Sequence, residues 1–298
     1  MARQLSKTVL VCVAAGYLLW GCAEREGDQA GPAGLRVEKV KVIDGLDLPE
    51  CVVIDPNDEA MYISNVVTAS EAYWVDDSNG FISLAAADGE IEQLRWIEST
   101  SDVSIHDPKG MCILDGKLYF SDNSMLKYRA LKDGSRVEII EVPGAGKLND
   151  LATDGRCVWA SDSETGKVFC IEPDGTIRRI KGPAGINGIT WHKDTLYAVS
   201  WDLHEVYELD PDGEAEPSPF GLSEHFTALD GIEVLDDGTF IVSDYMGNKL
   251  CAIEADRKTV HTLMELESPA DIGLDRNRML LYVPEMLADR VTVLKLRR

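Results

Sequence analysis

A repeating pattern of short apolar strands and polar turns runs through the chain from residue 47 onward. Each copy has a first strand, an Asp- or Gly-containing turn, and a second strand rich in β-branched and aromatic residues. The first strands read PECVVID (49–55), PKGMCIL (108–114), LNDLATD (148–154), INGITWH (186–192), LDGIEVL (229–235) and PADIGLD (269–275). The second strands read MYISN (61–65), LYFSD (118–122), VWASD (158–162), LYAVS (196–200), FIVSD (240–244) and LLYVP (280–284). Outside the N-terminal apolar stretch, no segment has a convincing helical period.

A repeat of about 40 residues with up to four short strands is typical of one blade of a β-propeller. The six copies therefore predict an all-β fold over residues 36–298, a six-bladed β-propeller with four-stranded blades. The last repeat stops at its third strand, 290–295, whereas Arg36–Asp44 has strand character near the start of the chain. We expect this N-terminal strand to close the last blade. The first repeat is longer than the others, and its extra residues, 67–79 and 98–106, are expected to form loops over one face.

The first 21 residues are typical of a secretory signal peptide. Arg3 and Lys7 precede an apolar stretch, 8–19, that is too short to span a bilayer. The stretch ends in Trp-Gly-Cys, which resembles a bacterial lipoprotein signal and implies that Cys22 is lipidated, with residues 22–35 as a flexible tether. The alternative is an ordinary cleaved signal and a chance Cys. We expect an exported bacterial lipoprotein on the periplasmic or cell-surface side, held to the membrane through its lipid anchor only.

The charge balance excludes one class of partner. The chain has 29 Lys and Arg against 52 Asp and Glu, a formal net charge of −23. Nucleic-acid binding rests on basic clusters that neutralise phosphates, and none of the needed size is present, so nucleic acid is not an expected partner. Acidity alone is more often a solubility feature than a metal site.

The cysteines show no metal-ligand spacing. Besides the two in the N-terminal segment, they are Cys51, Cys112, Cys157, Cys170 and Cys251. Cys157 and Cys170 flank a predicted hairpin turn and could meet, and an oxidising exterior would permit a disulfide. A cysteine can also be buried simply as a small hydrophobic residue, without forming a disulfide. We therefore expect all five cysteines to be free, buried thiols.

Each of the six first strands is expected to place one residue at the same mouth of the central channel. In a propeller the first strand of every blade runs along this channel, so the residues near the strand starts converge. The aligned positions are Glu50, Lys109, Asn149, Asn187, Asp230 and Ala270. Four of them carry oxygen ligands, and two converging carboxylates would repel each other in a desolvated channel unless a cation were present. This hard-oxygen set favours Ca²⁺ over zinc or copper and leaves coordination places for water and substrate.

Each of these residues also has a structural explanation. Asn187 and Asp230 each precede a glycine, and such pairs commonly form turns where a strand begins. The coincidence of four oxygen side chains at one repeat position is what favours a metal. The Asp residues that end second strands, Asp122, Asp162 and Asp244, are instead expected to bond neighbouring backbone as scaffold elements.

At these positions the chain resembles the family of gluconolactonase, regucalcin (senescence marker protein) and diisopropylfluorophosphatase, six-bladed calcium-dependent hydrolases. The resemblance covers residues 40–298 and is carried by PECVVID, LNDLATD, INGITWH and LDGIEVLDDGTFIVSD. It implies that Glu50, Asn149, Asn187 and Asp230 hold the catalytic metal and that Asp230 also serves as base or nucleophile.

Three further residues, Lys109, Asp271 and His106, are candidates for substrate contacts, and the axial positions of Lys109 and Ala270 depart from the family pattern. Lys109 occupies an axial position, where a fixed cation either weakens metal binding or holds an anionic substrate. Ala270 supplies no ligand, but the adjacent Asp271 is a candidate for supporting the site or a second ion. His106 is a candidate proton acceptor at the mouth, although a loop His is more often exposed and idle.

Together these features predict a calcium-dependent hydrolase of a lactone or related ester, acting on a small-molecule substrate. Ca²⁺ would act as a Lewis acid on a carbonyl or phosphoryl oxygen, with Asp230 as base or nucleophile. The alternative is a non-catalytic, NHL-like propeller that binds a protein or carbohydrate partner at the cell envelope. Because propellers host both kinds of function, the fold does not decide between them.

Overall fold

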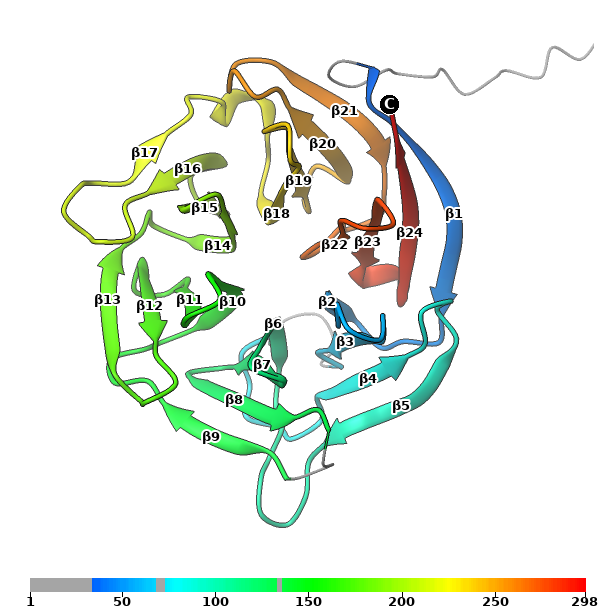
Figure 1. Ribbon diagram of the computed structural model, residues 1–298, viewed down its shortest axis with the longest axis vertical. Helices are drawn as coiled ribbons and strands as arrows, with labels where there is room; N and C mark the ends of the chain where they lie inside the picture. The colour runs from blue at the N-terminus through cyan, green and yellow to red at the C-terminus, as the bar shows by residue number, and fades with distance from the viewer. Residues whose placement is uncertain (1–33, 68–72, 133–135) are drawn as a thin grey trace, which may run out of the picture.

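The computed structural model describes residues 34–67, 73–132 and 136–298. The predicted signal peptide, Cys22, nearly all of the tether and part of the first long loop lie outside these residues. The described chain forms six four-stranded antiparallel sheets arranged as blades around a central axis (Figure 1). The predicted six-bladed β-propeller is therefore confirmed. In the described part of the chain, no helix has the length and apolar character needed to cross a membrane.

The blades follow one another in chain order. Blades 1 to 3 contain β2 (Pro49–Ile54), β3 (Met61–Asn65), β4 (Phe81–Ala85) and β5 (Ile91–Glu98); β6 (Pro108–Leu114), β7 (Lys117–Asp122), β8 (Met125–Ala130) and β9 (Glu138–Glu141); and β10 (Leu148–Thr153), β11 (Val158–Asp162), β12 (Lys167–Ile171) and β13 (Ile177–Lys181). Blades 4 to 6 contain β14 (Ile186–His192), β15 (Thr195–Ser200), β16 (Glu205–Leu209) and β17 (Ser218–Pro219); β18 (Leu229–Val234), β19 (Phe240–Asp244), β20 (Lys249–Ile253) and β21 (Val260–Glu265); and β22 (Gly273–Asp275), β23 (Leu280–Glu285), β24 (Arg290–Arg297) and β1 (Arg36–Asp44). Two 3₁₀ turns, η2 (Ser223–His225) and η3 (Met286–Ala288), lie between strands.

The last blade is closed by the N-terminal strand, as predicted. β1 pairs antiparallel with β24, from Arg36 opposite Arg297 to Asp44 opposite Arg290. β1 leads directly into β2, whose first residues lie at the channel mouth. The N-terminal end of β1 therefore lies at the opposite face of the ring from the mouth.

The hydrophobic core is divided among the seams between neighbouring blades. Every residue of β11 is buried, because one face packs against blade 2 and the other against blade 4. Trp159, for example, packs with Leu196 of blade 4, whereas Val158 packs with Leu114 of blade 2. Burial on both faces explains why the second strands are continuous apolar runs without alternation.

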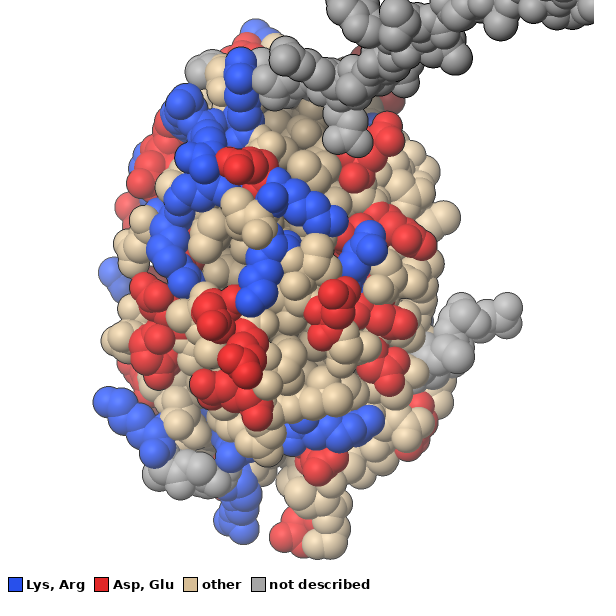
Figure 2. Space-filling model, turned by 90° about the vertical axis from the view of Figure 1, so that its right-hand side faces the viewer, with Lys and Arg blue, Asp and Glu red and all other residues tan. Residues whose placement is uncertain are grey.

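Basic residues gather on the side of this acidic protein that carries β1 and β24. Figure 2 views the molecule from the side that carries β1 and β24, where Lys and Arg gather at the upper left of the view. These two strands carry Arg36, Lys39, Lys41, Arg290, Lys295 and Arg297, against Glu38 and Asp44.

Two cysteines that we expected to be free are joined in a disulfide. Cys157 precedes β11 and Cys170 lies on β12, and the pairing of these strands brings the two Cα atoms to 6.1 Å. That distance is within the range that a disulfide spans. The expectation of free thiols is wrong for this pair. It is confirmed for Cys51, Cys112 and Cys251, which are free and buried.

Candidate functional site

A β-bulge near the start of the first strand in blades 1 to 5 sets the axial residues there apart from the regular ladder. In blade 3, Leu148 pairs with Asp162, but the next pair is Leu151 with Ala160, so Asn149 lies within the irregular step. The same shift occurs where β2, β6, β14 and β18 pair with their second strands. Such a bulge redirects side chains. This recurring irregularity places the axial residues at the channel mouth.

Serines in the second strands fix these bulges and connect neighbouring blades. The Ser161 Oγ accepts the amide hydrogen of Asp150 at 2.9 Å and donates to the carbonyl oxygen of Asn187 at 2.7 Å. Equivalent serine hydroxyls donate to the carbonyl oxygens of Asn149 and Ala270, one blade further on. Ser161 and Ser243 therefore each bind the amide that follows one axial residue and the carbonyl oxygen of the axial residue in the next blade.

The Asp residues after these serines have the predicted scaffold role. The Asp162 carboxylate accepts hydrogen bonds from the amides of Gly146 and Lys147 at 2.8 and 3.0 Å. Asp122 and Asp244 accept equivalent bonds from the loops that enter their own blades. Each carboxylate thus fixes the approach to the first strand.

Close approach of the first strands requires glycine beside two axial residues. A Cβ on Gly188 would lie 2.2 Å from the carbonyl oxygen of Asp230, and one on Gly231 would lie 2.6 Å from the amide nitrogen of Ile272. These distances are far below van der Waals contact. The glycines after Asn187 and Asp230 therefore let adjacent blades meet at the axis.

All four predicted ligands are buried. Glu50, Asn149, Asn187 and Asp230 are between 5 and 7 % exposed. Three of their oxygen atoms, Glu50 Oε2, Asn149 Oδ1 and Asp230 Oδ1, have no hydrogen-bond partner. The Nδ2 of Asn149 donates to Ser163 Oγ at 3.1 Å, which fixes the amide orientation and leaves its oxygen unpaired. Buried oxygens without partners are costly, and a cation would satisfy them.

The pKa shifts of the Glu50 and Asp230 carboxyls also favour a bound cation. Burial raises the pKa of Glu50 well above its usual value, and the nearby Asp230 carboxylate raises it further. Burial raises the pKa of Asp230 to about 7, opposed by the Lys109 ammonium. Both groups are therefore held in surroundings that disfavour their anionic forms unless positive charge is supplied.

The chemistry of this donor set fits Ca²⁺. It consists of carboxylate and amide oxygens, the ligands that hard divalent cations prefer, and three of the five unpartnered buried oxygens in the described residues belong to it. Within the described residues, no three His, Cys, Asp or Glu side chains are grouped as metal ligands. The axial set contains only two carboxylates and draws its other oxygens from asparagines.

Lys109 lies in the same enclosed space and is 4 % exposed. Its Nζ donates to the carbonyl oxygen of Tyr73 at 2.8 Å and lies 4.3 Å from the ring centroid of Trp74. Burial lowers the pKa of Lys109, and the carboxylates of Glu50 and Asp107 oppose this effect. Tyr73 and Trp74 of the first-blade loop thus lie against this lysine.

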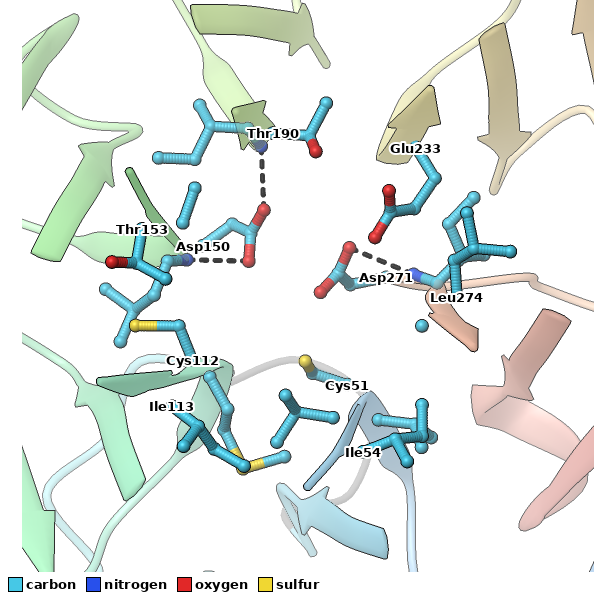
Figure 3. A pocket seen from close by; sticks show the side chains of 18 of the residues that line it. Cys51, Ile54, Cys112, Ile113, Asp150, Thr153, Thr190, Glu233, Asp271 and Leu274 are labelled. Atoms are coloured by element: carbon cyan, nitrogen blue, oxygen red, sulfur yellow. Dashed lines mark hydrogen bonds between the residues drawn. The ribbon is translucent and has the colours of Figure 1, made fainter. Parts of the chain in front are cut away.

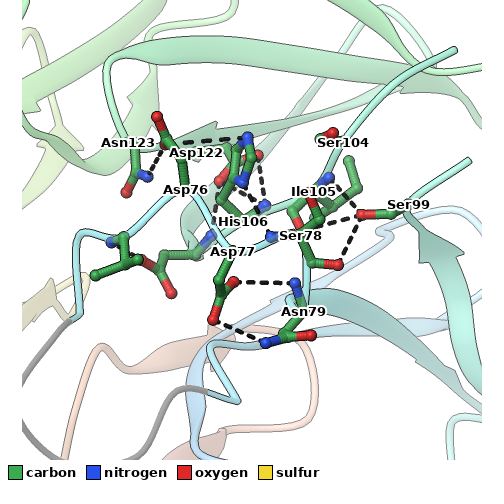
Figure 4. A network of polar contacts seen from close by, with 12 residues as sticks. Asp76, Asp77, Ser78, Asn79, Ser99, Ser104, Ile105, His106, Asp122 and Asn123 are labelled. Carbon is green, nitrogen blue, oxygen red and sulfur yellow. Dashed lines mark hydrogen bonds and ion pairs between the residues drawn. The ribbon is translucent and has the colours of Figure 1, made fainter.

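His106 belongs to the loop network beside the mouth and is separate from the axial set (Figure 4). Its Nδ1 accepts the Ser78 amide hydrogen at 3.1 Å, and its Nε2 lies 3.9 Å from Asp76 Oδ1. Asn123 donates to the same Asp76 oxygen at 2.7 Å. These contacts give His106 a role in ordering the loop that covers Lys109.

Asp271 lies one layer below the axial residues, toward the opposite end of the channel. It faces Asp150 across the channel and borders a cavity of about 260 Å³ (Figure 3). Its Oδ1 accepts the amide hydrogen of Ile272 at 2.9 Å. Burial raises the pKa of both carboxyls; Glu50 raises that of Asp271, and Asp271 raises that of Asp150. Asp271 thus lines this cavity, and its amide donates to the carbonyl oxygen of Glu50 at 3.0 Å.

Some site residues were not anticipated from the sequence. Asp150 and Ser163 contact the axial layer, and Tyr73 and Trp74 cover it. A sequence signal existed for the bulge serines Ser121, Ser161 and Ser243, because each directly precedes a scaffold Asp, but there was none for Ser163, which follows Asp162. The loop residues have no counterpart in the other repeats and gave no such signal.

Comparison with solved structures identifies several proteins of similar fold. A putative gluconolactonase is 19 % identical over 91 % of this chain and 94 % of its own, with a TM-score of 0.66. A gluconolactonase from Xanthomonas campestris is 14 % identical over 90 and 91 % of the two chains, also with a TM-score of 0.66. A catalytically inactive variant of virginiamycin B lyase from Staphylococcus aureus, solved with quinupristin, is 15 % identical over 88 and 99 %, with a TM-score of 0.62. These likenesses establish the fold. No protein-family model and no curated protein sequence matches the chain.

Proposed function

We propose that this protein is a calcium-dependent hydrolase of a lactone or related ester, with its metal at the channel mouth. The observation that carries the proposal is the group of unpartnered, buried oxygens of Glu50, Asn149 and Asp230. Asn187 completes the set from the adjacent blade. Gluconolactonases among the proteins of similar fold support a small-molecule substrate.

The chain's own residues have distinct tasks in this proposal. Bound Ca²⁺ would supply Lewis-acid polarisation of the substrate carbonyl. Asp230 accepts a proton from the attacking water, or attacks the carbonyl itself. Glu50 and the two asparagines orient the site, and enclosure by Tyr73 and Trp74 limits access of bulk water. Lys109 provides a fixed cation for the negative charge that develops on the substrate.

Calorimetric titration with Ca²⁺, followed by a lactone panel, tests the proposal. We expect the wild-type protein to bind Ca²⁺, and Asp230→Asn, which keeps an oxygen but removes the charge, to bind it much more weakly. Asp174→Asn is the matched control, because Asp174 lies in an exposed turn. Absence of binding, or equal binding by wild type and Asp230→Asn, would refute a metal-dependent hydrolase.

The competing function is a propeller that binds a protein or carbohydrate partner without catalysis. It is favoured by the contacts of Tyr73 and Trp74 with Lys109, which narrow the space beside the axial residues. In that case Ca²⁺ would be structural, and its binding would be accompanied by no turnover of any lactone.

The location that we propose is the cell envelope, through lipidation at Cys22. Support comes from the N-terminal sequence and from the Cys157–Cys170 disulfide, which an exported protein can keep. Because β1 starts at the face opposite the mouth, the tether would leave the mouth free to receive substrate from the aqueous side. Labelling of Cys22 by a lipid precursor, and its loss in Cys22→Ser, tests this location.

A further inference from the structure

A second cavity, of about 580 Å³, lies where blades 3 and 4 meet. It is lined by residues 163–167, which run from β11 into β12, by residues 179–182 and 184–185, which lead from β13 into β14, and by Asp202 after β15. β11 ends opposite Leu148, the residue before the axial Asn149, so the turn after β11 belongs to the mouth side of the ring. This cavity, here called the blade 3–4 groove, therefore lies on the same side of the ring as the candidate metal site.

One end of the groove touches the candidate metal site. Ser163 lines the groove, and its Oγ accepts a hydrogen bond from the Nδ2 of Asn149 at 3.1 Å. The Oδ1 of Asn149 is one of the unpartnered oxygens of the predicted ligand set. A substrate held at that site would therefore have the groove beside it, on the side of blade 3.

Three cations line the groove from one face of blade 3. Lys167 on β12 is directly opposite Lys181 on β13. Arg179 comes two residues before Lys181 on the same strand, and side chains two residues apart point to the same face of a sheet. Like charges directly opposite each other on neighbouring strands destabilise a sheet. A bound anion would offset this repulsion.

Two of these cations have no counter-ion in the protein. Lys181 forms an ion pair with Glu216, an exposed residue before β17. Among the described residues, no hydrogen bond or ion pair involves the side chain of Lys167 or Arg179. Two unpaired positive charges thus share one cavity in a protein whose formal net charge is −23.

The two carboxylates that line the groove lie against glycines. A Cβ on Gly185 would be 2.4 Å from the Cγ of Asp202, and a Cβ on Gly146 would be 2.3 Å from the Oε2 of Glu164. Within the described part of the chain, neither carboxylate forms an ion pair with the groove cations. Lys167 and Arg179 are therefore available to an anionic ligand.

Further cations lie between the groove and the axis. The Ser163 amide donates to the carbonyl oxygen of Lys147 at 2.9 Å. The Nζ atoms of Lys147 and of the axial Lys109 lie 5.6 and 4.3 Å from the ring centroid of Trp74. An anionic ligand would therefore meet positive charge both beside the metal site and in the groove.

We infer that the substrate carries an anionic group, a carboxylate or a phosphate, which Lys167 and Arg179 bind in the blade 3–4 groove while the reacting carbonyl lies at the metal site. The inference rests on the proposed function, because it identifies the ligand of the groove as the substrate. Ammonium and guanidinium groups bind both anions through charge-assisted hydrogen bonds, and Arg can donate two such bonds at once. A neutral sugar lactone offers the groove no group of this kind.

The first test compares substrates that differ in this charge, on the full-length chain purified in detergent with Ca²⁺. One lactone carries a carboxyalkyl side chain, a second carries an alkyl phosphate, and a third carries the neutral carboxamide. We expect kcat/KM for at least one anionic lactone to exceed that for the carboxamide by about tenfold or more. The anion with the larger value is the one that the groove selects. Added salt should reduce the advantage.

Variants of the groove show where the advantage arises. Lys167→Met and Arg179→Met keep much of the side-chain length but remove the charge. Each should lower the ratio of kcat/KM, anionic over carboxamide substrate, by about fivefold, mainly through KM. Arg156→Met, at an exposed position between β10 and β11, is the matched control and should keep the wild-type ratio. A wild-type protein without the anionic advantage, or an equal advantage in all four proteins, would overturn the inference.

A second measurement separates failure of the inference from failure of the proposed function. A lactam with the same carboxyalkyl side chain resists hydrolysis, and its calorimetric binding should weaken in Lys167→Met and Arg179→Met but not in Arg156→Met. If lactones are hydrolysed without preference for the anion, and all variants bind the lactam equally, the inference is overturned while the hydrolase stands. If no lactone is hydrolysed but lactam binding depends on Lys167 and Arg179, the groove stands as an anion site and the hydrolase falls. If neither hydrolysis nor lactam binding occurs, both are overturned.

Discussion

The Ser161 hydroxyl donates a hydrogen bond of 2.7 Å to the carbonyl oxygen of Asn187, a predicted ligand in the next blade. The same hydroxyl accepts the amide hydrogen of Asp150, so one small side chain fixes two backbone segments at the axis. The geometry of the candidate metal site therefore depends on residues such as Ser161 that are not themselves predicted ligands.

Ser161→Ala should weaken both stability and calcium binding. Removal of the hydroxyl leaves a buried carbonyl and a buried amide without partners, at a cost of about 1–3 kcal/mol in the free energy of unfolding. Urea unfolding gives this cost, and calorimetry gives the accompanying fall in Ca²⁺ affinity. Ser218→Ala, in the exposed strand β17, serves as control and should match wild type. Ca²⁺ affinity that is unchanged in Ser161→Ala would show that the hydroxyl does not position Asn187.

Stability of the calcium-free protein should fall as pH rises. The pKa of Asp230 is raised from 3.8 to about 7 in the folded protein, so folding favours the protonated carboxyl. The stabilising contribution is complete below the unfolded value of 3.8 and is lost as pH rises through about 7, a change on the order of a few kcal/mol. Urea unfolding between pH 4 and 8 in chelator should show the decline, and millimolar Ca²⁺ should reduce it.

The Asp230→Asn variant identifies the source of that decline. Without the ionisable group, the unfolding free energy in chelator should depend less on pH than in wild type. Equal pH dependence in the two proteins would assign the effect to other carboxyls.

Lys109→Met should tighten calcium binding. The Lys109 ammonium shares a buried space with Glu50 and Asp230, and the charges of these groups influence one another. Removal of this cation leaves both carboxylates to the metal, and we expect Ca²⁺ affinity to rise by about tenfold, or 1.4 kcal/mol. Lys193→Met, at a turn far from the mouth, is the control. A fall in Ca²⁺ affinity would instead mean that the ammonium organises the site.

Removal of the disulfide should destabilise blade 3 measurably. The Cys157–Cys170 bridge closes a loop with a sequence separation of 13, for which chain entropy predicts a loss of about 3 kcal/mol on removal. The double variant Cys157→Ser, Cys170→Ser should show this loss in guanidinium unfolding. Wild type in reductant should approach the same value, and a reductant-insensitive midpoint would argue against the bridge.

Regular spacing in the sequence was enough to predict the fold. First and second strands recur at similar intervals, both faces of the inner strands are buried, and the last repeat lacks a fourth strand that Arg36–Asp44 supplies. The strand at 269–275 was predicted longer than it is. Only Gly273–Asp275 forms regular ladder there, because Pro269 lacks an amide hydrogen and joins Glu285 through an isolated bridge.

The site was predictable only where the repeat itself carries the signal. Alignment of the first strands predicts Glu50, Asn149, Asn187 and Asp230 as ligands, and the structure buries all four. The coverage of Lys109 by Tyr73 and Trp74 depends on a loop found in one blade, so no comparison among repeats reveals it. Pairing of Cys157 with Cys170 likewise depends on the strand register, which cysteine spacing alone leaves open.

The last blade cannot form until the end of the chain has been synthesised, because it needs both β1 and β24. β1 precedes the other described strands in the chain, yet among the described residues it pairs only with β24, near residue 298. It must stay unpaired while five blades and most of the sixth are made, and contacts between such distant residues are slow to form. A chain that stops before Arg290 would thus leave an open sheet edge on β23 and a loose strand on β1, an arrangement suited to pairing between molecules.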